Sequence, residues 1–199
     1  MDFDGNFNKL TELDIAPMRS RLIALPDTCW LANTSRQQRF EVHGKTQSIL
    51  LIYDSDFRYH QPSENKTYDE FRDTVRPIIT FLENRFGQTG YILRLLFTRL
   101  PAKSEIPRHR DKGASLAYVH RLHLPIQTNN EVHFTVGNET NHMRAGELWE
   151  INNCRQHSVI NRGHESRIHL ILDWVTPALA QKYLEHTAQR TKLAHNLNL

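Results

Sequence analysis

The chain has 199 residues and a formal net charge of +3 at pH 7, and 39% of its residues are hydrophobic and 24% charged. This length and composition are typical of one globular domain. Lysine and arginine are not clustered, and no apolar run reaches the ~20 residues of a membrane-spanning helix, so we expect no nucleic-acid partner and no membrane partner.

Cysteine usage favours a reducing compartment. Cys29 and Cys154 are the only cysteines, too few for a disulfide framework, and they form no C-x-x-C pair. Cys154 is expected to be a small buried apolar side chain. The polar, acidic N-terminus does not resemble a signal peptide. We therefore expect a cytoplasmic protein, and nothing in the sequence indicates its oligomeric state.

The N-terminal part is predicted to be a mixed α/β support covering residues 1–88. Residues 1–47 are polar and irregular, with a short helix expected from about Pro17. The apolar run 48–54 predicts a strand. Apolar residues recur at helical spacing over 68–86, which predicts a helix that packs on the outside of a sheet.

After residue 88 the pattern changes to short apolar segments separated by polar turns. The predicted strands are 91–100, 117–126, 131–136, 146–152, 157–161 and 166–175. Many strands without helical segments between them indicate an antiparallel sandwich or barrel, such as a cupin-like jelly roll. We thus predict one domain over 1–199: a mainly β double-stranded β-helix core at 89–175, flanked by the N-terminal helices and a C-terminal helix at 176–199.

Histidines gather in the strand-rich part, where eight of the twelve fall between positions 109 and 169. His109-Arg110-Asp111 is an H-x-D triplet, whose outer side chains point the same way in extended backbone. His157 begins a later strand that could lie beside it. Two histidines and one carboxylate form the facial triad of non-haem Fe(II) oxygenases. Taken alone, the triplet could also be a surface turn, and His157 a residue at a strand end.

Cationic side chains alternate with apolar ones along three predicted strands. The polar residues that share a face within each strand are Arg94 with Thr98, Arg121 with His123, and Arg167 with His169. If the apolar faces pack against helices, these polar faces point into the barrel. A buried arginine is costly unless it meets an anion, and a guanidinium suits a ligand carboxylate. In the opposite arrangement, the arginines would face solvent.

The ordered segments FTRLPAKSEIPRHRD, HRLHLPI, GELWEINN, QHSVIN and SRIHLILD resemble the aspartyl/asparaginyl β-hydroxylase family of Fe(II)/2-oxoglutarate oxygenases. The resemblance covers residues 91–175, and the ordered set is far more specific than any single segment. It implies a hydroxylase that inserts oxygen into an unactivated C–H bond. The implied cofactors are Fe(II), the co-substrate 2-oxoglutarate and O2.

The resemblance also implies roles for individual residues. His109 and His157 would be iron ligands. Arg167 would pair with the distal carboxylate of 2-oxoglutarate, aided by the Thr98 hydroxyl, and His123 would contact the carboxylate next to the keto group.

One departure from the animal family member concerns the iron. That enzyme has glycine at the position of Asp111, whereas this chain keeps the aspartate, as do the similar bacterial proline cis-4-hydroxylases. The resemblance therefore favours a complete catalytic triad of His109, Asp111 and His157 and disfavours halogenation. Arg121 lies where relatives hold a carboxylate of their substrate. Together with Arg94, it suggests a carboxylate-bearing small molecule, peptide or protein side chain as substrate.

Two other functions remain open from the sequence. The chain could be a cupin-type metal-dependent enzyme that does not use 2-oxoglutarate, or a non-catalytic jelly-roll binding domain. Arg167 and Thr98 discriminate against the first, because they have no role unless a dicarboxylate binds there. Metal found in the purified protein would argue against a non-catalytic binding domain.

Overall fold

The protein is described by a computed structural model covering residues 3–34, 38, 41–54, 59–87, 89–111 and 113–196, with side chains as far as residue 190. Residues 197–199 of the predicted C-terminal helix lie outside the described part.

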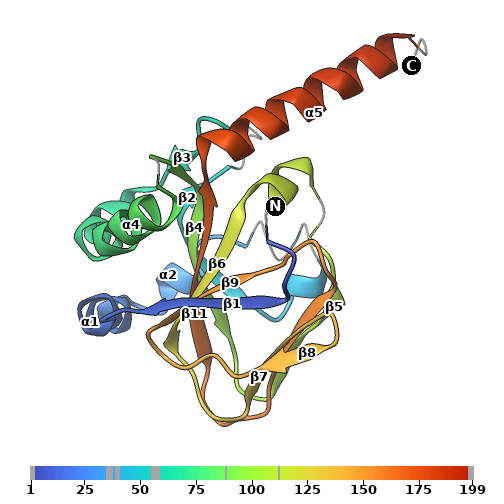
Figure 1. Cartoon of the computed structure of the whole chain (residues 1–199). Coiled ribbons are helices and arrows are strands. Elements are labelled where there is room, and N and C mark those ends of the chain that lie inside the picture. The colour runs from blue at the N-terminus through green and yellow to red at the C-terminus, as the bar shows by residue number, and fades with distance from the viewer. Residues whose placement is uncertain are drawn as a thin grey trace.

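Two antiparallel sheets form the body of the molecule (Figure 1). Their strands are β1 (Phe7–Glu12), β2 (Gln47–Tyr53), β3 (Ser63–Glu64), β4 (Tyr91–Leu100), β5 (Ser104–His109), β6 (His120–Gln127), β7 (Val132–Val136), β8 (Glu139–Asn141), β9 (Glu147–Ile151), β10 (His157–Asn161) and β11 (Arg167–Val175). The larger sheet has the order β1-β9-β6-β11-β4-β2-β3, and the smaller has the order β5-β10-β7-β8. This interleaved order confirms the predicted double-stranded β-helix.

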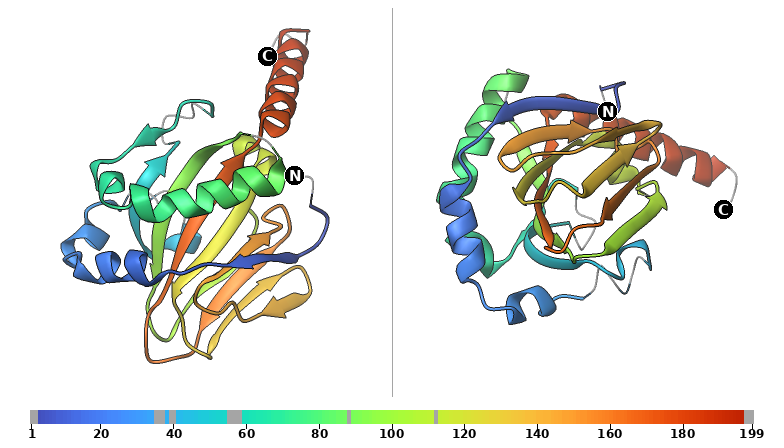
Figure 2. Two further views of the ribbon diagram at one scale, coloured as in Figure 1. Left: turned by 60° about the vertical axis from the view of Figure 1, so that its left-hand side comes forward. Right: turned by 90° about the horizontal axis from the view of Figure 1, so that it is seen from below.

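Helices flank the larger sheet and complete the predicted architecture. They are α1 (Ala16–Ala24), α2 (Thr28–Leu31), α4 (Arg72–Phe86) and α5 (Pro177–Asn196), with short 3-10 helices at Glu41–His43, Lys66–Glu70 and Ala114–Tyr118. Figure 2 shows α1 and α4 along one side of the barrel, whereas α5 extends away from the body (Figure 1). Gly87 ends α4 in a left-handed conformation, with φ of 63°. None of the helices in the described ranges is both long and apolar enough to cross a membrane.

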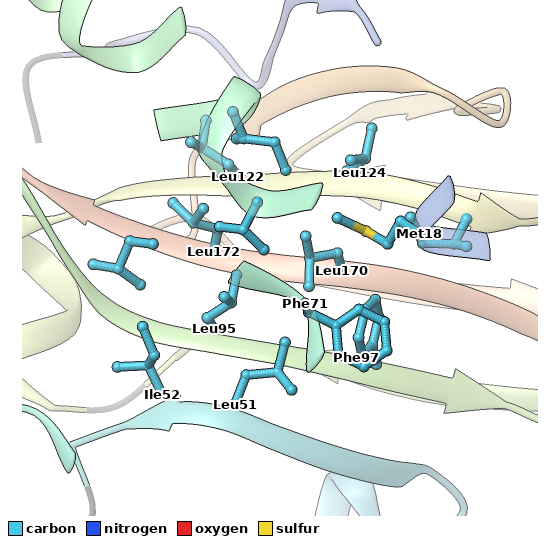
Figure 3. Close-up of a cluster of buried hydrophobic side chains, with 14 of the residues drawn as sticks. Met18, Leu51, Ile52, Phe71, Leu95, Phe97, Leu122, Leu124, Leu170 and Leu172 are labelled. Carbon is cyan, nitrogen blue, oxygen red and sulfur yellow. The ribbon is translucent and has the colours of Figure 1, made fainter. Parts of the chain in front are cut away.

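The main hydrophobic core lies between these helices and the outer face of the larger sheet (Figure 3). Its sheet residues include Leu95, Phe97, Leu122, Leu124, Leu170 and Leu172. Met18 of α1 and Phe71 contact them from the helical side. Because side chains alternate across a strand, this packing turns the arginines of the same strands inward. The predicted assignment of the two faces is confirmed.

Several features differ from the predictions, among them the short elements α2, β3 and β8, which were not predicted. β1 and β5 were not predicted, because each is an edge strand and lacks a regular apolar alternation. Pro107 in β5 also fits an edge position, since it has no N–H to donate to a second neighbour. β6 begins at His120 rather than at 117, because a 3-10 helix covers Ala114–Tyr118. Cys154 is exposed rather than buried, since it lies in the turn that precedes β10.

Candidate active site

The pairing of β5 with β10 brings two predicted metal ligands together. His109, the last residue of β5, is the direct cross-strand partner of His157, the first residue of β10. Their ring centroids are 4.3 Å apart. Oδ1 of Asp111 lies 3.9 Å from Nε2 of His109 and 3.8 Å from Nε2 of His157. The ligand atoms of the three residues all lie within 4.8 Å of one another, close enough to share one ion.

Backbone contacts fix which nitrogen of each imidazole is available. Nδ1 of His109 lies 2.7 Å from the Pro107 carbonyl, and Nδ1 of His157 lies 3.0 Å from the Arg155 carbonyl. A carbonyl oxygen only accepts hydrogen bonds, so each Nδ1 carries the proton and each Nε2 keeps its lone pair for a metal. Burial lowers the pKa of His157 below its usual value, which favours the neutral, ligating form.

The two oxygens of Asp111 have different surroundings. Oδ1 faces the two imidazoles, whereas Oδ2 accepts a hydrogen bond from Nη1 of Arg121. Two neutral imidazoles and one carboxylate oxygen are the donor set that non-haem Fe(II) takes on one face of its coordination sphere. The residues present therefore fit this metal.

Arg167 lies at the inner end of the site and is only 1% exposed. Its Nη1 lies 3.5 Å from the Thr98 hydroxyl, and its Nη2 donates to Nδ1 of His169 at 2.8 Å. A small cavity of about 30 Å³, roughly the volume of one water, joins Arg167, Thr98 and His123 to the three metal-ligand candidates. The structure thus brings together all three residues predicted to bind 2-oxoglutarate.

His123 and His169 are buried beside Arg167, with their Nδ1 atoms 3.4 Å apart. Burial, reinforced by the charge of Arg167, lowers the pKa of both histidines well below the usual value of 6.5. Because a guanidinium only donates, Nδ1 of His169 must accept, so its proton is on Nε2. Both residues are neutral in the folded protein.

These lowered pKa values predict that stability falls in acid. Below pH 6.5 the unfolded chain takes up protons at His123 and His169 that the folded chain does not, so the free energy of unfolding decreases. Each histidine contributes up to about 1.4 kcal/mol per pH unit until the pH reaches its folded-state pKa. Urea denaturation between pH 7.5 and 5.5 measures this slope. His169→Gln should reduce the slope by nearly one proton at the acid end of this range, whereas His164→Gln, at an exposed position, should leave it unchanged. An equal slope in His169→Gln and wild type would contradict the assignment.

A chain of buried charges continues from Asp111 along the inner face of the larger sheet. Arg121 binds Asp173 through two hydrogen bonds, Nε to Oδ1 at 2.8 Å and Nη2 to Oδ2 at 2.7 Å. Arg94 contacts Asp173 and Asp54, each at 3.2 Å. Burial disfavours a charged guanidinium, but Asp111 and Asp173 outweigh it and raise the pKa of Arg121 above its usual value. The two predicted substrate-binding arginines therefore already contact aspartates.

The main cavity, of about 880 Å³, opens beside the metal-ligand candidates and is lined by both Arg94 and Arg121. Exposed Arg108 and Arg110 also line it, and so does Tyr183 from α5. Sequence reasoning missed these three residues. The only available signal for Arg110 was its place between His109 and Asp111.

The fold and the site together define a class of protein. A His-Asp-His set inside a double-stranded β-helix, with a buried arginine across a cavity, is the arrangement of non-haem Fe(II) oxygenases that use 2-oxoglutarate. The sequence model of the family "Aspartyl/Asparaginyl beta-hydroxylase" matches residues 51–177, which is more than half of the chain. The chain belongs to this family. It is a 2-oxoglutarate-dependent hydroxylase whose cofactors are Fe(II), 2-oxoglutarate and O2.

Solved structures with the same fold have low sequence identity to the chain. An oxidoreductase of the 2OG-Fe(II) oxygenase family from Burkholderia pseudomallei is 16% identical, with a TM-score of 0.54 over 84% of this chain and 93% of that one. The non-heme monooxygenase ThoJ, in complex with nickel, is 12% identical, with a TM-score of 0.55 over 86% and 74%. AviO1 from Streptomyces viridochromogenes Tue57 is 11% identical, with a TM-score of 0.52 over 87% and 90%. Among curated protein sequences, no match is found.

Proposed function

We propose that His109, Asp111 and His157 hold Fe(II) and that the enzyme hydroxylates an unactivated C–H bond of a carboxylate-bearing substrate. The observation that carries this proposal is the convergence of two imidazole Nε2 atoms on one carboxylate oxygen. When bound, Fe(II) with 2-oxoglutarate and O2 supplies the oxidising power that replaces hydrogen by hydroxyl and releases succinate and CO2. The protein supplies orientation, charge neutralisation and exclusion of water.

Arg167, Thr98 and His123 would hold 2-oxoglutarate. The Arg167 guanidinium would pair with the distal carboxylate with help from the Thr98 hydroxyl, and His123 would contact the carboxylate next to the keto group. These residues and the metal-ligand candidates line one cavity, which supports the assignment. The cavity is small, so the diacid would need side-chain shifts to enter it.

The balance of charges in the interior supports a dianionic co-substrate. The charged groups buried or nearly buried around the two cavities, in the part of the chain that the structure describes, are Arg94, Arg121, Arg167, Asp54, Asp111 and Asp173. The positive charges of the three guanidiniums and the negative charges of the three carboxylates cancel. A divalent cation would leave two positive charges uncompensated in a buried site, which is costly. A dicarboxylate restores neutrality.

The main cavity supports a carboxylate on the substrate. Arg121 uses three of its five N–H donors on aspartates, which leaves two for a ligand. Together with Arg94, it would orient the substrate so that one C–H faces the metal. Exposed Arg108 and Arg110 add positive charge at the cavity. A volume of about 880 Å³ is typical of sites for drug-sized ligands, so a peptide fits as well as a free amino acid.

We also propose that residues 1–199 act as one domain, with 1–88 supporting the β-helix core at 89–175 and 176–199 forming a C-terminal helix. Two observations support this. β1 and β2 are strands of the larger sheet, and Tyr183 of α5 lines the main cavity.

A succinate-production screen tests the proposed function. Purified protein with Fe(II), 2-oxoglutarate and O2 should form succinate slowly alone and faster with its substrate, whose mass should increase by one oxygen atom. Free amino acids and short peptides are each compared with their amides, and the carboxylate forms should be preferred. His157→Ala should bind no metal and form no succinate. Metal binding without consumption of 2-oxoglutarate would indicate a cupin-type enzyme of another kind, and absence of metal binding would indicate a binding domain.

A further inference from the structure

Asp173 is a fully buried carboxylate at the centre of the larger sheet. On β11 it is the cross-strand partner of Arg94 on β4 and of Arg121 on β6. A buried ion pair is seldom needed for stability, because apolar residues of similar size often stabilise a fold as well or better. The presence of Asp173 between two arginines therefore calls for a role beyond the fold.

Asp173 fixes the orientation of the Arg121 guanidinium. It accepts from Nε and from Nη2, so two parallel hydrogen bonds hold the planar group in one orientation. Arg94, on the neighbouring strand β4, also donates to Oδ2 of Asp173 and is itself bound by Asp54. The one terminal nitrogen of Arg121 that does not contact Asp173, Nη1, then points at Asp111.

Arg121 in turn fixes Asp111. This residue lies beyond the last residue of β5, in irregular backbone, so the sheet does not set the direction of its side chain. The hydrogen bond from Arg121 occupies Oδ2 and leaves Oδ1 facing the Nε2 atoms of His109 and His157. Asp111 is thereby held so that a single oxygen is presented to a metal.

We propose that Asp173 is a positioning residue for the metal centre, acting through Arg121 to hold Asp111 in its single-oxygen ligand geometry. This inference rests on the proposed function, because it takes His109, Asp111 and His157 as the metal ligands. Hydrogen-bond partners of metal ligands typically contribute 10- to 100-fold to metal affinity. Asp173 is one residue further from the metal than Arg121. Its effect on metal affinity would be transmitted through the two hydrogen bonds that it accepts from Arg121.

Titration of the metal-free protein with Ni²⁺, followed by calorimetry, tests this inference without turnover. Asp173→Asn should weaken Ni²⁺ binding by about 10-fold or more. The same change in an Arg121→Gln background should alter affinity by less than about 3-fold, because the connecting residue is gone. Glu150→Gln is the matched control: Glu150 is also buried, but its partner is His120, outside the site. Its Ni²⁺ affinity should equal that of wild type.

Equal loss of affinity from Asp173→Asn in both backgrounds would show a merely structural role and overturn the inference. If Asp173→Asn does not fold, Arg121→Lys replaces it, since lysine keeps the charge but lacks the planar fork. Weaker Ni²⁺ binding in a cooperatively folded Arg121→Lys protein is then expected, and wild-type affinity would refute the proposal. A different result would contradict the proposed metal site itself, namely equal Ni²⁺ affinity of wild type and His157→Ala.

Discussion

Replacement of Arg167 by alanine is expected to raise the 2-oxoglutarate concentration needed for half-maximal turnover by at least about 30-fold. The guanidinium is 1% exposed, and removal of one partner from a buried charge pair costs about 2–5 kcal/mol, where 1.4 kcal/mol is a factor of ten. Succinate formation at varied 2-oxoglutarate measures the requirement. Calorimetric titration of the Ni²⁺-loaded protein with 2-oxoglutarate measures binding alone.

The matched control for Arg167→Ala is Arg162→Ala, because Arg162 is exposed in the turn between β10 and β11. It should keep the wild-type requirement. A thermal melt confirms that each variant is folded, since Arg167→Ala also leaves a space in the interior. If folded Arg167→Ala with intact Ni²⁺ binding needed no more 2-oxoglutarate than wild type, Arg167 would not be part of the site.

Asp111→Ala is expected to lower hydroxylation by more than about 100-fold while the protein still unfolds cooperatively. Even hydrogen-bond partners of metal ligands contribute 10- to 100-fold, so the loss of a ligand should cost more. The fold should persist because Asp173 still neutralises Arg121. Product formation and Ni²⁺ affinity should fall together in this variant, whereas Arg167→Ala should spare Ni²⁺ affinity.

Glu105→Ala is the control for Asp111→Ala, since Glu105 is an exposed carboxylate on β5, the strand that precedes Asp111. Glu105→Ala should form product at the wild-type rate. Normal hydroxylation by Asp111→Ala would show that the iron needs only the two histidines, as the resemblance implies for the animal relative with glycine at this position.

The strands and the faces of the sheet could be predicted because they depend on local alternation. Leu122 and Leu124 point one way and Arg121 and His123 the other, whatever the neighbouring strand is. The strands 91–100 and 157–161 were predicted with their observed bounds for the same reason. β5 has little apolar alternation to detect, because it is an edge strand with a single buried position, Ile106.

The ionic contacts of the site could not be predicted from the sequence. The position of Asp173 opposite both Arg94 and Arg121 depends on the register of β11 against two neighbours, which alternation does not determine. Arg94 and Arg121 were predicted to bind a substrate carboxylate, and the contacts that both make with aspartates of the chain itself were not predicted. Arg108 and Arg110 were missed because cavity walls form only when distant segments meet.

The edge position of β5 means that a bound metal would also affect the pairing of the smaller sheet. Of the strands described, only β10 is hydrogen-bonded to β5, and the metal-ligand candidates His109 and His157 face each other across that one seam. If both imidazoles hold one ion, that ion would cross-link β5 to β10 at the end of the pair where the site lies. Metal binding would then stabilise the pairing of an edge strand that has a single neighbour.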